Sequence, residues 1–507
     1  MQGVSNTGDN HNTKSDIFGQ ENQSMPKKPT VTQISIPALL FAFAVIYGLI
    51  SLVNHYYFRT YTLDLGFYTN ALFDYRNLRW NYSQTISEVP SNMLGGHFEP
   101  ILFLFAPFSF LFGSYTLLLI QMAALLWGGF CVYRYFKDSN RAVSIGATAF
   151  FLGYFSLFAA LAFDFHTNVI AAACVPYLFL SVKRGRFAHF AAAFVFMLLC
   201  KENISLWLLF ICLGLAFEYR KNAVWRKRLL WFAALSLCYF GVLVYGIIPL
   251  LSHTGGYAGF LYSSLGRTPH EAIVYMLTHP LGVLKLLFTN TSPYPVYDWD
   301  KLEFHILILL TGLPLFLFRP GYLLMLLPLY LQKMLHDQPS LWGVGLHYGV
   351  EFAPIMAIGV FEVINGIHKE RVKTWAAGLM AVLGLSVTFH TMDSTITFTN
   401  KTRIRFYQKA HYTQAYDVKA VHRILREIPA DAKVSAQAVF LPHLALRPHI
   451  YQFPLVEDAE FIVYSVREGG YPLTATEFHD QIAAYSNSPE WMVWRKHDGF
   501  YVLKKRP

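Results

Sequence analysis

Charged residues are scarce in this chain. They make up 14% of its 507 residues, whereas hydrophobic residues make up 54% and aromatic residues 17%. A soluble domain usually carries about 25% charged residues. Most of the chain therefore needs a non-aqueous solvent, and we expect a membrane protein. The formal net charge of +10 agrees with this, because basic residues gather in the cytoplasmic loops of membrane proteins.

Cysteine is scarce as well. The five cysteines lie in or beside apolar segments, and no two of them have the CxxC spacing of a zinc or redox site. This pattern favours neither a disulfide framework nor a zinc site. The chain also contains no GxxxxGK[ST], GxSxG or HExxH motif. Nothing in it therefore supports cytoplasmic nucleotide chemistry.

Long apolar runs recur along the chain from residue 34 to residue 395. A membrane-crossing helix needs about 20 apolar residues, and fewer where the helix is broken or buried in protein. The runs predict a mainly α-helical, polytopic transmembrane bundle of about 11 spans. The expected spans are 34–56, 115–136, 142–162, 167–182, 187–200, 203–218, 229–251, 302–318, 321–335, 347–366 and 374–391.

The loops between these runs predict an orientation. Residues 1–33 are polar and predict a disordered cytoplasmic tail; they are not a signal peptide, because the apolar run that follows is too long. Basic residues gather in the loops on the same side, at 183–186, 220–228 and 368–373. We therefore expect a multi-pass protein of the bacterial cytoplasmic (inner) membrane with its N-terminus in the cytoplasm.

Two long loops fall on the opposite, extracytoplasmic side, at 58–114 and 252–300. The first ends in an apolar stretch at 101–113, which we interpret as an interfacial helix. A crossing there would invert every later span and scatter the basic loops over both faces. The second loop contains another expected interfacial helix at 272–288.

The composition changes after residue 395. Residues 400–507 are mixed and charged, with no run that could span a membrane. A helix is expected at 417–428, and His497-Asp498-Gly499 is typical of a hairpin turn. The expected strands are 433–438, 449–453, 460–466, 491–495 and 500–504. The sequence thus predicts a small extracytoplasmic α/β domain at the C-terminus.

Four polar clusters lie at the extracytoplasmic ends of the expected spans. Polar groups near membrane depth are costly and tend to be functional. Random helix-end residues would not all fall on one side. The cluster members are Asp64; His97 and Glu99; Asp164 and His166; and Lys201 and Glu202. His347 and Tyr348, beside a later loop on the same side, are further candidates for substrate binding.

Each cluster also has a purely structural interpretation. An aspartate just outside a helix is often a cap, and an interfacial histidine can be a packing residue. Asp164 and His166 are two positions apart and would not share one helical face, so they could converge only in an irregular turn. Lys201 and Glu202 could form an ion pair that closes a re-entrant turn. The residues alone leave both interpretations open.

The chemistry of the set is nevertheless coherent. Asp64 could act as a general base that activates an acceptor hydroxyl, and Asp164 could orient that acceptor. Histidine and lysine could neutralise a phosphate or pyrophosphate leaving group. If a divalent metal such as Mg or Mn takes part, Asp64 and Asp164 are its candidate ligands.

These motifs resemble those of a bacterial and archaeal family of predicted multi-pass membrane proteins of unknown function. That family is similar in plan to the GT-C class of polyprenyl-phosphate-sugar-dependent glycosyltransferases. The resemblance covers residues 35–465. The matching stretches include Leu63-Asp-Leu-Gly66, Gly96-His-Phe-Glu-Pro100, Asp164-Phe-His166, Lys201-Glu202, His347-Tyr348 and Pro442-His-Leu-Ala-Leu-Arg447.

The resemblance implies a GT-C-like, lipid-linked glycosyltransferase. In that class an acidic residue early in the first extracytoplasmic loop is the usual base or metal-linked carboxylate, and Asp64 matches it. Asp164 matches a second acidic motif. The implied reaction moves a sugar, with inversion, from a polyprenyl-phosphate donor to an extracytoplasmic glycan, lipid or protein acceptor, without nucleic acid. The residues implied to bind substrate are His97, Glu99, Asp164, His166, Lys201, Glu202, His347 and Tyr348.

Two other functions fit the same residues. A transporter or flippase of lipid-linked glycans would share the polar cavity, although such proteins often contain inverted repeats and no repeat is visible here. A non-enzymatic membrane scaffold would use the C-terminal domain as its binding part.

Overall fold

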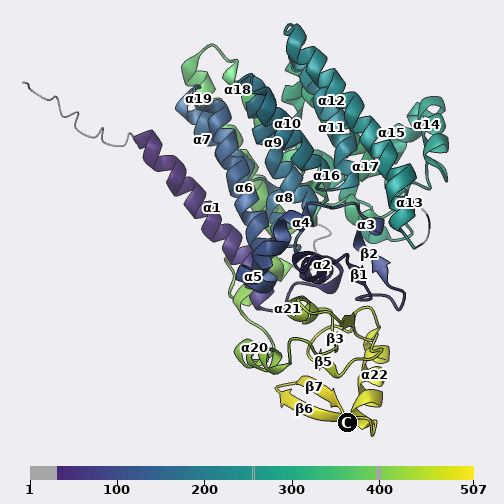
Figure 1. Ribbon diagram of the computed structural model, residues 1–507. Coiled ribbons are helices and arrows are strands. Elements are labelled where there is room, and N and C mark those ends of the chain that lie inside the picture. The colour runs from purple at the N-terminus through teal and green to yellow at the C-terminus, as the bar shows by residue number, and fades with distance from the viewer. Residues whose placement is uncertain (1–30, 254, 256, 258, 396–400) are drawn as a thin grey trace, which may run out of the picture.

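The computed structural model describes residues 31–253, 255, 257, 259–395 and 401–507. Its helices stand side by side in one bundle, and a small domain with a sheet lies at one end of that bundle (Figure 1). The expected cytoplasmic tail lies almost wholly outside the described residues.

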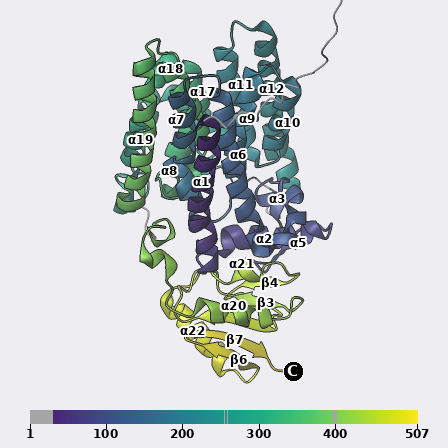
Figure 2. The ribbon, with the colours of Figure 1, turned by 90° about the vertical axis from the view of Figure 1, so that its left-hand side faces the viewer.

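The bundle is built from helices that run between its two ends (Figures 1 and 2). They are α1 (Val31–Tyr56), α6 (Thr116–Phe136), α7 (Arg141–Leu152), α8 (Phe155–Leu161), α9 (Thr167–Lys183), α10 (Phe187–Leu198), α11 (Glu202–Glu218), α12 (Ala223–Val242), α16 (Asp300–Leu310), α17 (Pro320–Leu335), α18 (Phe352–Asn365) and α19 (Glu370–Ser394).

Six stretches of the described chain are long and apolar enough to cross a membrane. They are Ile36–Tyr56, Leu102–Phe136, Arg141–Leu161, Ala223–Leu251, His347–Asn365 and Glu370–Ser394. The prediction of a polytopic helical membrane protein is confirmed, whereas the count of about 11 spans stays a prediction. Several expected spans form shorter helices, such as α9, which is apolar on all sides because it is packed inside the bundle.

Glycines set two of the local features of the bundle. A Cβ on Gly128 would lie 2.7 Å from the carbonyl oxygen of Ala173, so glycine there lets α6 approach α9 closely. Gly312 has a φ of +105°, a conformation that other residues rarely adopt. It ends α16, and the expected span at 302–318 continues from there as a 3₁₀ turn rather than as one helix.

The first long loop packs against one end of the bundle. Its elements are α2 (Phe67–Arg76), β1 (Tyr82–Ser83), β2 (Ser91–Asn92), α3 (Met93–Gly96), α4 (Leu102–Phe105) and α5 (Ser109–Phe112). The apolar stretch at 101–113 forms α4 and α5, and each is far shorter than the roughly 20 residues that a crossing needs. Gly113, with a φ of +54°, separates them from α6.

The second long loop holds two short helices, α14 (Pro269–Thr278) and α15 (Pro280–Leu286). A further short helix, α13 (Ile248–Leu251), ends the α12 span just before the loop. The expectation of a single helix at 272–288 is wrong. The chain breaks at His279, with φ −127° and ψ 53°, because a residue before proline is driven out of the helical region.

The C-terminal domain has a mixed five-stranded sheet, in the order β4-β3-β5-β7-β6. The first three strands are parallel, and β7 pairs antiparallel with both β5 and β6. The elements are α20 (Val418–Glu427), β3 (Val434–Ala436), α21 (Leu441–Leu444), β4 (Ile450–Gln452), β5 (Phe461–Ser465), α22 (Ala475–Asn487), β6 (Trp491–His497) and β7 (Phe500–Lys505). The predicted small α/β domain is confirmed as a fold.

Two helices of this domain, the short α21 and α22, were not predicted from the sequence. α22 begins with a capping box, in which Thr474 and Glu477 satisfy each other's backbone amides. The S/T-x-x-E spacing was the available signal. The predicted hairpin turn is present, with positive φ at Asp498 (+44°) and Gly499 (+82°).

The C-terminal domain contacts the first loop. A Cβ on Gly66 would lie 2.7 Å from Cδ2 of Leu441, so the start of α21 rests directly on the turn before α2. The Asn70 amide donates to the carbonyls of Ala445 and Arg447 at 3.2 and 3.1 Å. Loop and domain therefore form one structural unit.

The basic loops gather at the opposite end of the bundle. The α6–α7, α9–α10, α11–α12 and α18–α19 connections all lie there, away from the C-terminal domain (Figure 1). The helix directions in the fold thus segregate the basic loops as the sequence predicts.

Candidate functional site

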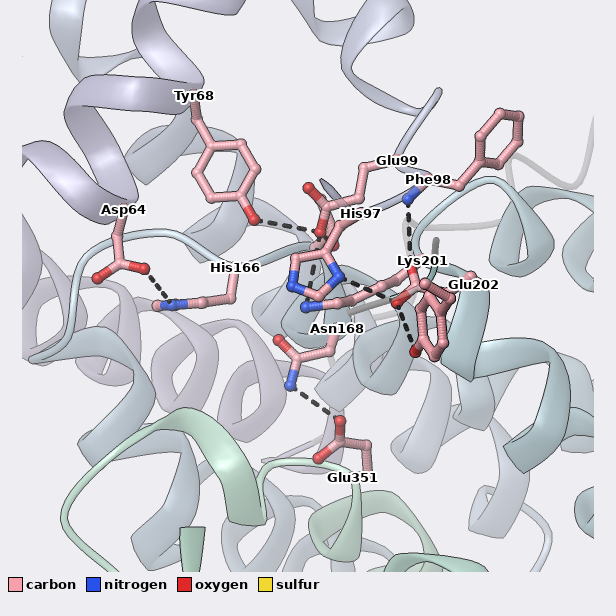
Figure 3. Close-up of polar contacts among 12 residues, drawn as sticks. Asp64, Tyr68, His97, Phe98, Glu99, His166, Asn168, Lys201, Glu202 and Glu351 are labelled. Atoms are coloured by element: carbon pink, nitrogen blue, oxygen red, sulfur yellow. Dashed lines mark hydrogen bonds and ion pairs between the residues drawn. The ribbon is translucent and has the colours of Figure 1, made fainter. Parts of the chain in front are cut away.

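Asp64 lies in η1 (Thr62–Gly66), a π-helical turn that follows α1 and leads into α2. The turn rests on the C-terminal domain, where the Thr62 hydroxyl donates to the carbonyl of Ala438 at 3.3 Å. The Asp64 side chain is 25% exposed, and its Oδ1 lies 3.1 Å from Nε2 of His166 (Figure 3). Such turns are rare and occur frequently at functional sites.

His166 is fixed by Gln121 and by a ring stack. Its backbone amide donates to Gln121 Oε1 at 3.0 Å, and Gln121 Nε2 donates to the carbonyl of Asp164 at 3.0 Å. The His166 ring stacks on that of His347 with centroids 3.4 Å apart, and the His347 and Tyr348 rings are 4.0 Å apart. Residues from three parts of the bundle therefore orient the imidazole that faces the η1 carboxylate.

Asp164 does not line the cavity beside Asp64. Its carboxylate is buried, with Oδ1 2.7 Å from Nη2 of Arg403 and Oδ2 accepting the backbone amide of Tyr61 at 2.8 Å. Its φ of +59° makes the turn before α9 irregular. The residue expected to hold an acceptor or a metal instead ties together three segments that are far apart in the sequence.

Glu202 binds the first long loop. Its Oε1 lies 2.9 Å from Nδ1 of His97, and its Oε2 accepts the backbone amide of Phe98 at 3.0 Å (Figure 3). The hydroxyl of Tyr257, in the second long loop, donates to Oε1 at 3.4 Å, and burial raises the pKa of that phenol. Because 47% of the His97 side chain is exposed, its ring remains accessible to a ligand.

Glu99 is the buried centre of a second network. Its Oε1 accepts hydrogen bonds from the hydroxyls of Tyr68 at 3.1 Å and Thr167 at 2.7 Å, and lies 3.9 Å from Nζ of Lys201. Burial, reinforced by Glu99, raises the pKa of Tyr68 well above its usual value, so the phenol stays protonated and donates. Glu99 Oε2 is buried and has no hydrogen-bond partner among the described residues.

These groups surround one cavity of about 630 Å³ between the bundle and the two long loops. Eight of the nine residues predicted for the site line it, and only Asp164 does not. The eight are Asp64, His97, Glu99, His166, Lys201, Glu202, His347 and Tyr348. A volume of this size suits a small-molecule or lipid head-group site.

Two lysines give the cavity positive charge. The Lys201 side chain is 17% exposed and has Glu99 as its neighbour. Lys333 is buried on α17 and donates to the carbonyl oxygens of Leu341 and Gly343. Lys333 has no carboxylate within ion-pair distance in the described part of the chain. An anionic group in the cavity would meet this lysine and Lys201 in a wall that also contains the carboxylates of Glu99, Glu202 and Glu351.

The described residues do not form a group of side chains that could bind a metal ion. No group of three or more histidine, cysteine, aspartate or glutamate side chains there is placed to hold a metal ion. The two candidate ligands are also separated in role, since Asp64 faces the cavity and Asp164 is held by Arg403.

Sequence analysis missed several partners of the site. Tyr68, Gln121, Asn168 and Tyr257 are ordinary polar residues of helices or loops, and only the fold brings them to the cavity wall or behind it. Asn168 donates to Glu351 at 2.8 Å (Figure 3). No local pattern signals such pairs, because their members lie far apart in the sequence.

The fold is shared with a solved membrane protein. The structure is similar to the crystal structure of ArnT from Cupriavidus metallidurans bound to undecaprenyl phosphate, with a TM-score of 0.50 and 13% sequence identity. The similarity covers 92% of this chain and 98% of that chain. The two proteins therefore share the fold of a helical membrane protein. No curated protein sequence matches the chain.

The family follows from the sequence itself. The model of the predicted membrane protein family DUF2079 matches residues 54–488. The chain belongs to this family. The resemblance inferred from the motifs is thereby confirmed, and the matched range includes every residue of the cavity described above.

Proposed function

We propose that this protein is a membrane glycosyltransferase that moves a sugar from a polyprenyl-phosphate-linked donor to an extracytoplasmic acceptor. The observation that carries the proposal is the partly exposed Asp64 carboxylate, paired with His166 in the wall of a polar cavity. The likeness in fold to a protein crystallised with undecaprenyl phosphate supports a polyprenyl lipid as the donor carrier.

Asp64 is the group suited to be the general base. In a single displacement the acceptor oxygen attacks the anomeric carbon, the bond from that carbon to the phosphate oxygen breaks, and the configuration inverts. The acceptor proton passes to the Asp64 carboxylate. His166, fixed by its backbone and its ring stack, holds that carboxylate in one orientation through Nε2.

The opposite wall is suited to the leaving group. Polyprenyl phosphate leaves with additional negative charge, and Lys201, Lys333 and the exposed ring of His97 bring positive or hydrogen-bonding groups to the same cavity. Preorganised charges of this kind lower the barrier most where charge develops. The aromatic residues Tyr68, Tyr257 and Tyr348 can pack against a sugar ring.

We further propose that the basic end of the bundle faces the cytoplasm, which places the cavity and the C-terminal domain outside the inner membrane. Fusions at the C-terminus test this. Alkaline phosphatase, active only outside the cytoplasm, should be active there, and green fluorescent protein should stay dark. The reverse result would contradict the orientation.

The test of the enzyme is direct. Purified protein is supplied with polyprenyl-phosphate sugars and candidate acceptors, and wild type is compared with Asp64→Asn. The control is Glu88→Gln, which removes an exposed carboxylate from the same loop and outside the cavity. Transfer should be lost in Asp64→Asn and kept in the control.

Two results would favour the other functions. Movement of an intact lipid-linked glycan across proteoliposomes, without sugar transfer, would indicate a flippase. Unchanged cellular function in folded variants of Asp64, Glu202 and Lys201 would indicate a scaffold.

A further inference from the structure

A second cavity lies at the other end of the bundle. It has a volume of about 180 Å³ and is bordered by α6, α9 and the start of α10. α9 begins beside the Asp64 cavity at Thr167 and ends at Lys183, so its 17 residues separate the two cavities by roughly 25 Å. The second cavity is therefore not part of the proposed catalytic site.

Three arginines line this second cavity, which we call the arginine groove. They are Arg134 at the end of α6, and Arg184 and Arg186 in the α9–α10 loop. No carboxylate lines the groove, and within the described ranges none of the three guanidinium groups forms an ion pair. Neighbouring basic residues at the same end do form them, as Lys183 does with Glu362 at 3.4 Å.

Two of the guanidinium groups are held in place, and one of these two lacks a hydrogen-bond acceptor. Arg184 Nη2 donates to the carbonyl oxygen of Arg134 at 3.2 Å, which holds the two residues together. Arg134 Nε is buried and has no hydrogen-bond partner among the described residues. A buried guanidinium nitrogen without an acceptor is costly. An added group with several acceptor oxygens would remove that cost.

The other walls of the groove are aromatic and apolar. Trp127 and Phe130 are 42% and 36% exposed, and both face outward from α6. The Trp127 ring lies 4.9 Å from that of Tyr177, whose hydroxyl is hydrogen bonded to His189 Nδ1 at 2.5 Å. Exposed aromatic residues of this kind mark the boundary between acyl chains and head groups in membrane proteins.

We propose that the arginine groove binds the phosphate of an anionic phospholipid in the leaflet at the basic end of the bundle. Guanidinium groups match the oxygens of a phosphate in pairs, and basic pockets between membrane helices take up anionic lipid head groups. The outward-facing aromatic side chains favour a phospholipid over free phosphate, because they give the acyl chains an apolar surface. This inference is independent of the proposed function.

The bound lipid would bridge α6, α9 and α10. The groove residues come from the end of α6 and from the connection between α9 and α10, and the phosphate would neutralise charges that otherwise repel each other. We therefore expect phosphatidylglycerol to raise the thermal stability of the purified protein, and phosphatidylcholine, which has no net charge, to do so much less.

The experiment uses the full chain in detergent with brominated phosphatidylglycerol, which quenches tryptophan fluorescence on contact. The chain has ten tryptophans, so the quenching of Trp127 is obtained by subtracting the quenching measured in Trp127→Phe from that measured in wild type. The triple variant Arg134→Gln, Arg184→Gln and Arg186→Gln should bind at least about tenfold more weakly. Brominated phosphatidylcholine should quench weakly in both proteins.

A matched variant removes the same charge elsewhere at this end. Arg141→Gln, Lys221→Gln and Arg371→Gln change three exposed residues that line none of the cavities described above. This control should bind phosphatidylglycerol as wild type does.

Three results would overturn the proposal. They are equal affinity of the triple variant and wild type, an equal loss in the matched control, and displacement of the lipid by millimolar inorganic phosphate, which would make this a free-phosphate site. Thermal unfolding in phosphatidylcholine shows that each variant is folded, so a loss of binding cannot be mistaken for a loss of structure.

Discussion

Nε2 of His166 lies 3.1 Å from Oδ1 of Asp64, and the two residues belong to segments about a hundred positions apart. His166 Nδ1 is buried and has no hydrogen-bond partner among the described residues. The ring therefore makes its single side-chain hydrogen bond to Asp64. The buried His166 imidazole therefore serves to hold the Asp64 carboxylate at the cavity surface.

His166→Gln should lower kcat because the Asp64 carboxylate loses its orientation. General-base catalysis contributes about 10²- to 10⁴-fold, so Asp64→Asn should cost that much and His166→Gln less. The double variant should be no worse than Asp64→Asn alone, since the two act as a unit. Steady-state kinetics measure this, with the exposed His270→Gln as control. Additive losses would contradict the coupling.

The buried pair of Asp164 and Arg403 should act on stability. Removing one partner of a buried ion pair costs about 3–5 kcal/mol, because the other charge stays buried and unpaired. Arg403→Gln should therefore lower the unfolding temperature strongly, and Asp164→Asn with Arg403→Gln should recover part of the loss. The comparison is Lys433→Gln, in a largely exposed pair with Asp458, which should change it little.

The outcome also assigns a role to Asp164. If the folded fraction of Asp164→Asn keeps a normal KM and kcat, then Asp164 only stabilises the fold. If Asp164→Asn instead has a normal unfolding temperature and a much higher KM, then Asp164 contacts the substrate.

Gly66→Ala tests the contact between the catalytic turn and the C-terminal domain. Its new Cβ would meet Cδ2 of the buried Leu441 at 2.7 Å, so either that side chain or the turn must shift. Activity should fall, and limited proteolysis should cut faster between the bundle and the domain. Gly469→Ala, in the C-terminal domain and outside the cavity, is the matched control, because a Cβ there has nothing within 4 Å. Equal behaviour of the two variants would contradict a tight contact.

The junction with α1 should be sensitive to acid. His443 is buried, stacks on His55 at 3.9 Å and lies 5.2 Å from the ring of His422. Burial lowers the pKa of His443 well below its ordinary value of 6.5. The unfolded chain therefore binds a proton near pH 6.5 that the folded chain excludes, and stability falls as the pH drops below that value.

This loss is at most about 1.4 kcal/mol per pH unit for one histidine. Thermal unfolding at pH 7.5 and pH 5 measures it, with His443→Gln as the variant that cannot titrate. The drop on acidification should be smaller in His443→Gln than in wild type. An equal drop in both would assign the acid sensitivity to other groups.

The general architecture could be predicted from the sequence because it depends on local composition. Apolar runs predicted the helices, and loop charges predicted which connections share an end of the bundle. The strands of 400–507 followed from alternation and turn residues. Helix breaks were harder to predict, since the break at Gly312 depends on a positive φ and the buried helices need fewer than about 20 residues.

The sequence could predict the site only as a set of residues on one side of the membrane. Asp64, His97 and Lys201 were predicted because polar groups are costly near membrane depth. The fold brings these three residues to one cavity. The ion pair of Asp164 could not be predicted, because Arg403 lies in a segment of ordinary composition after α19, the last helix of the bundle. Two residues so far apart in the sequence are brought together only by tertiary packing.

The contacts of the η1 turn also set an order of events during biosynthesis. Arg403 and Ala438, which hold Asp164 and Thr62, follow α19 in the sequence and emerge from the ribosome after it. All the bundle helices can therefore enter the bilayer before the turn that carries Asp64 has its final supports. A chain that ends before these residues would therefore lack the two contacts that support the turn and Asp164.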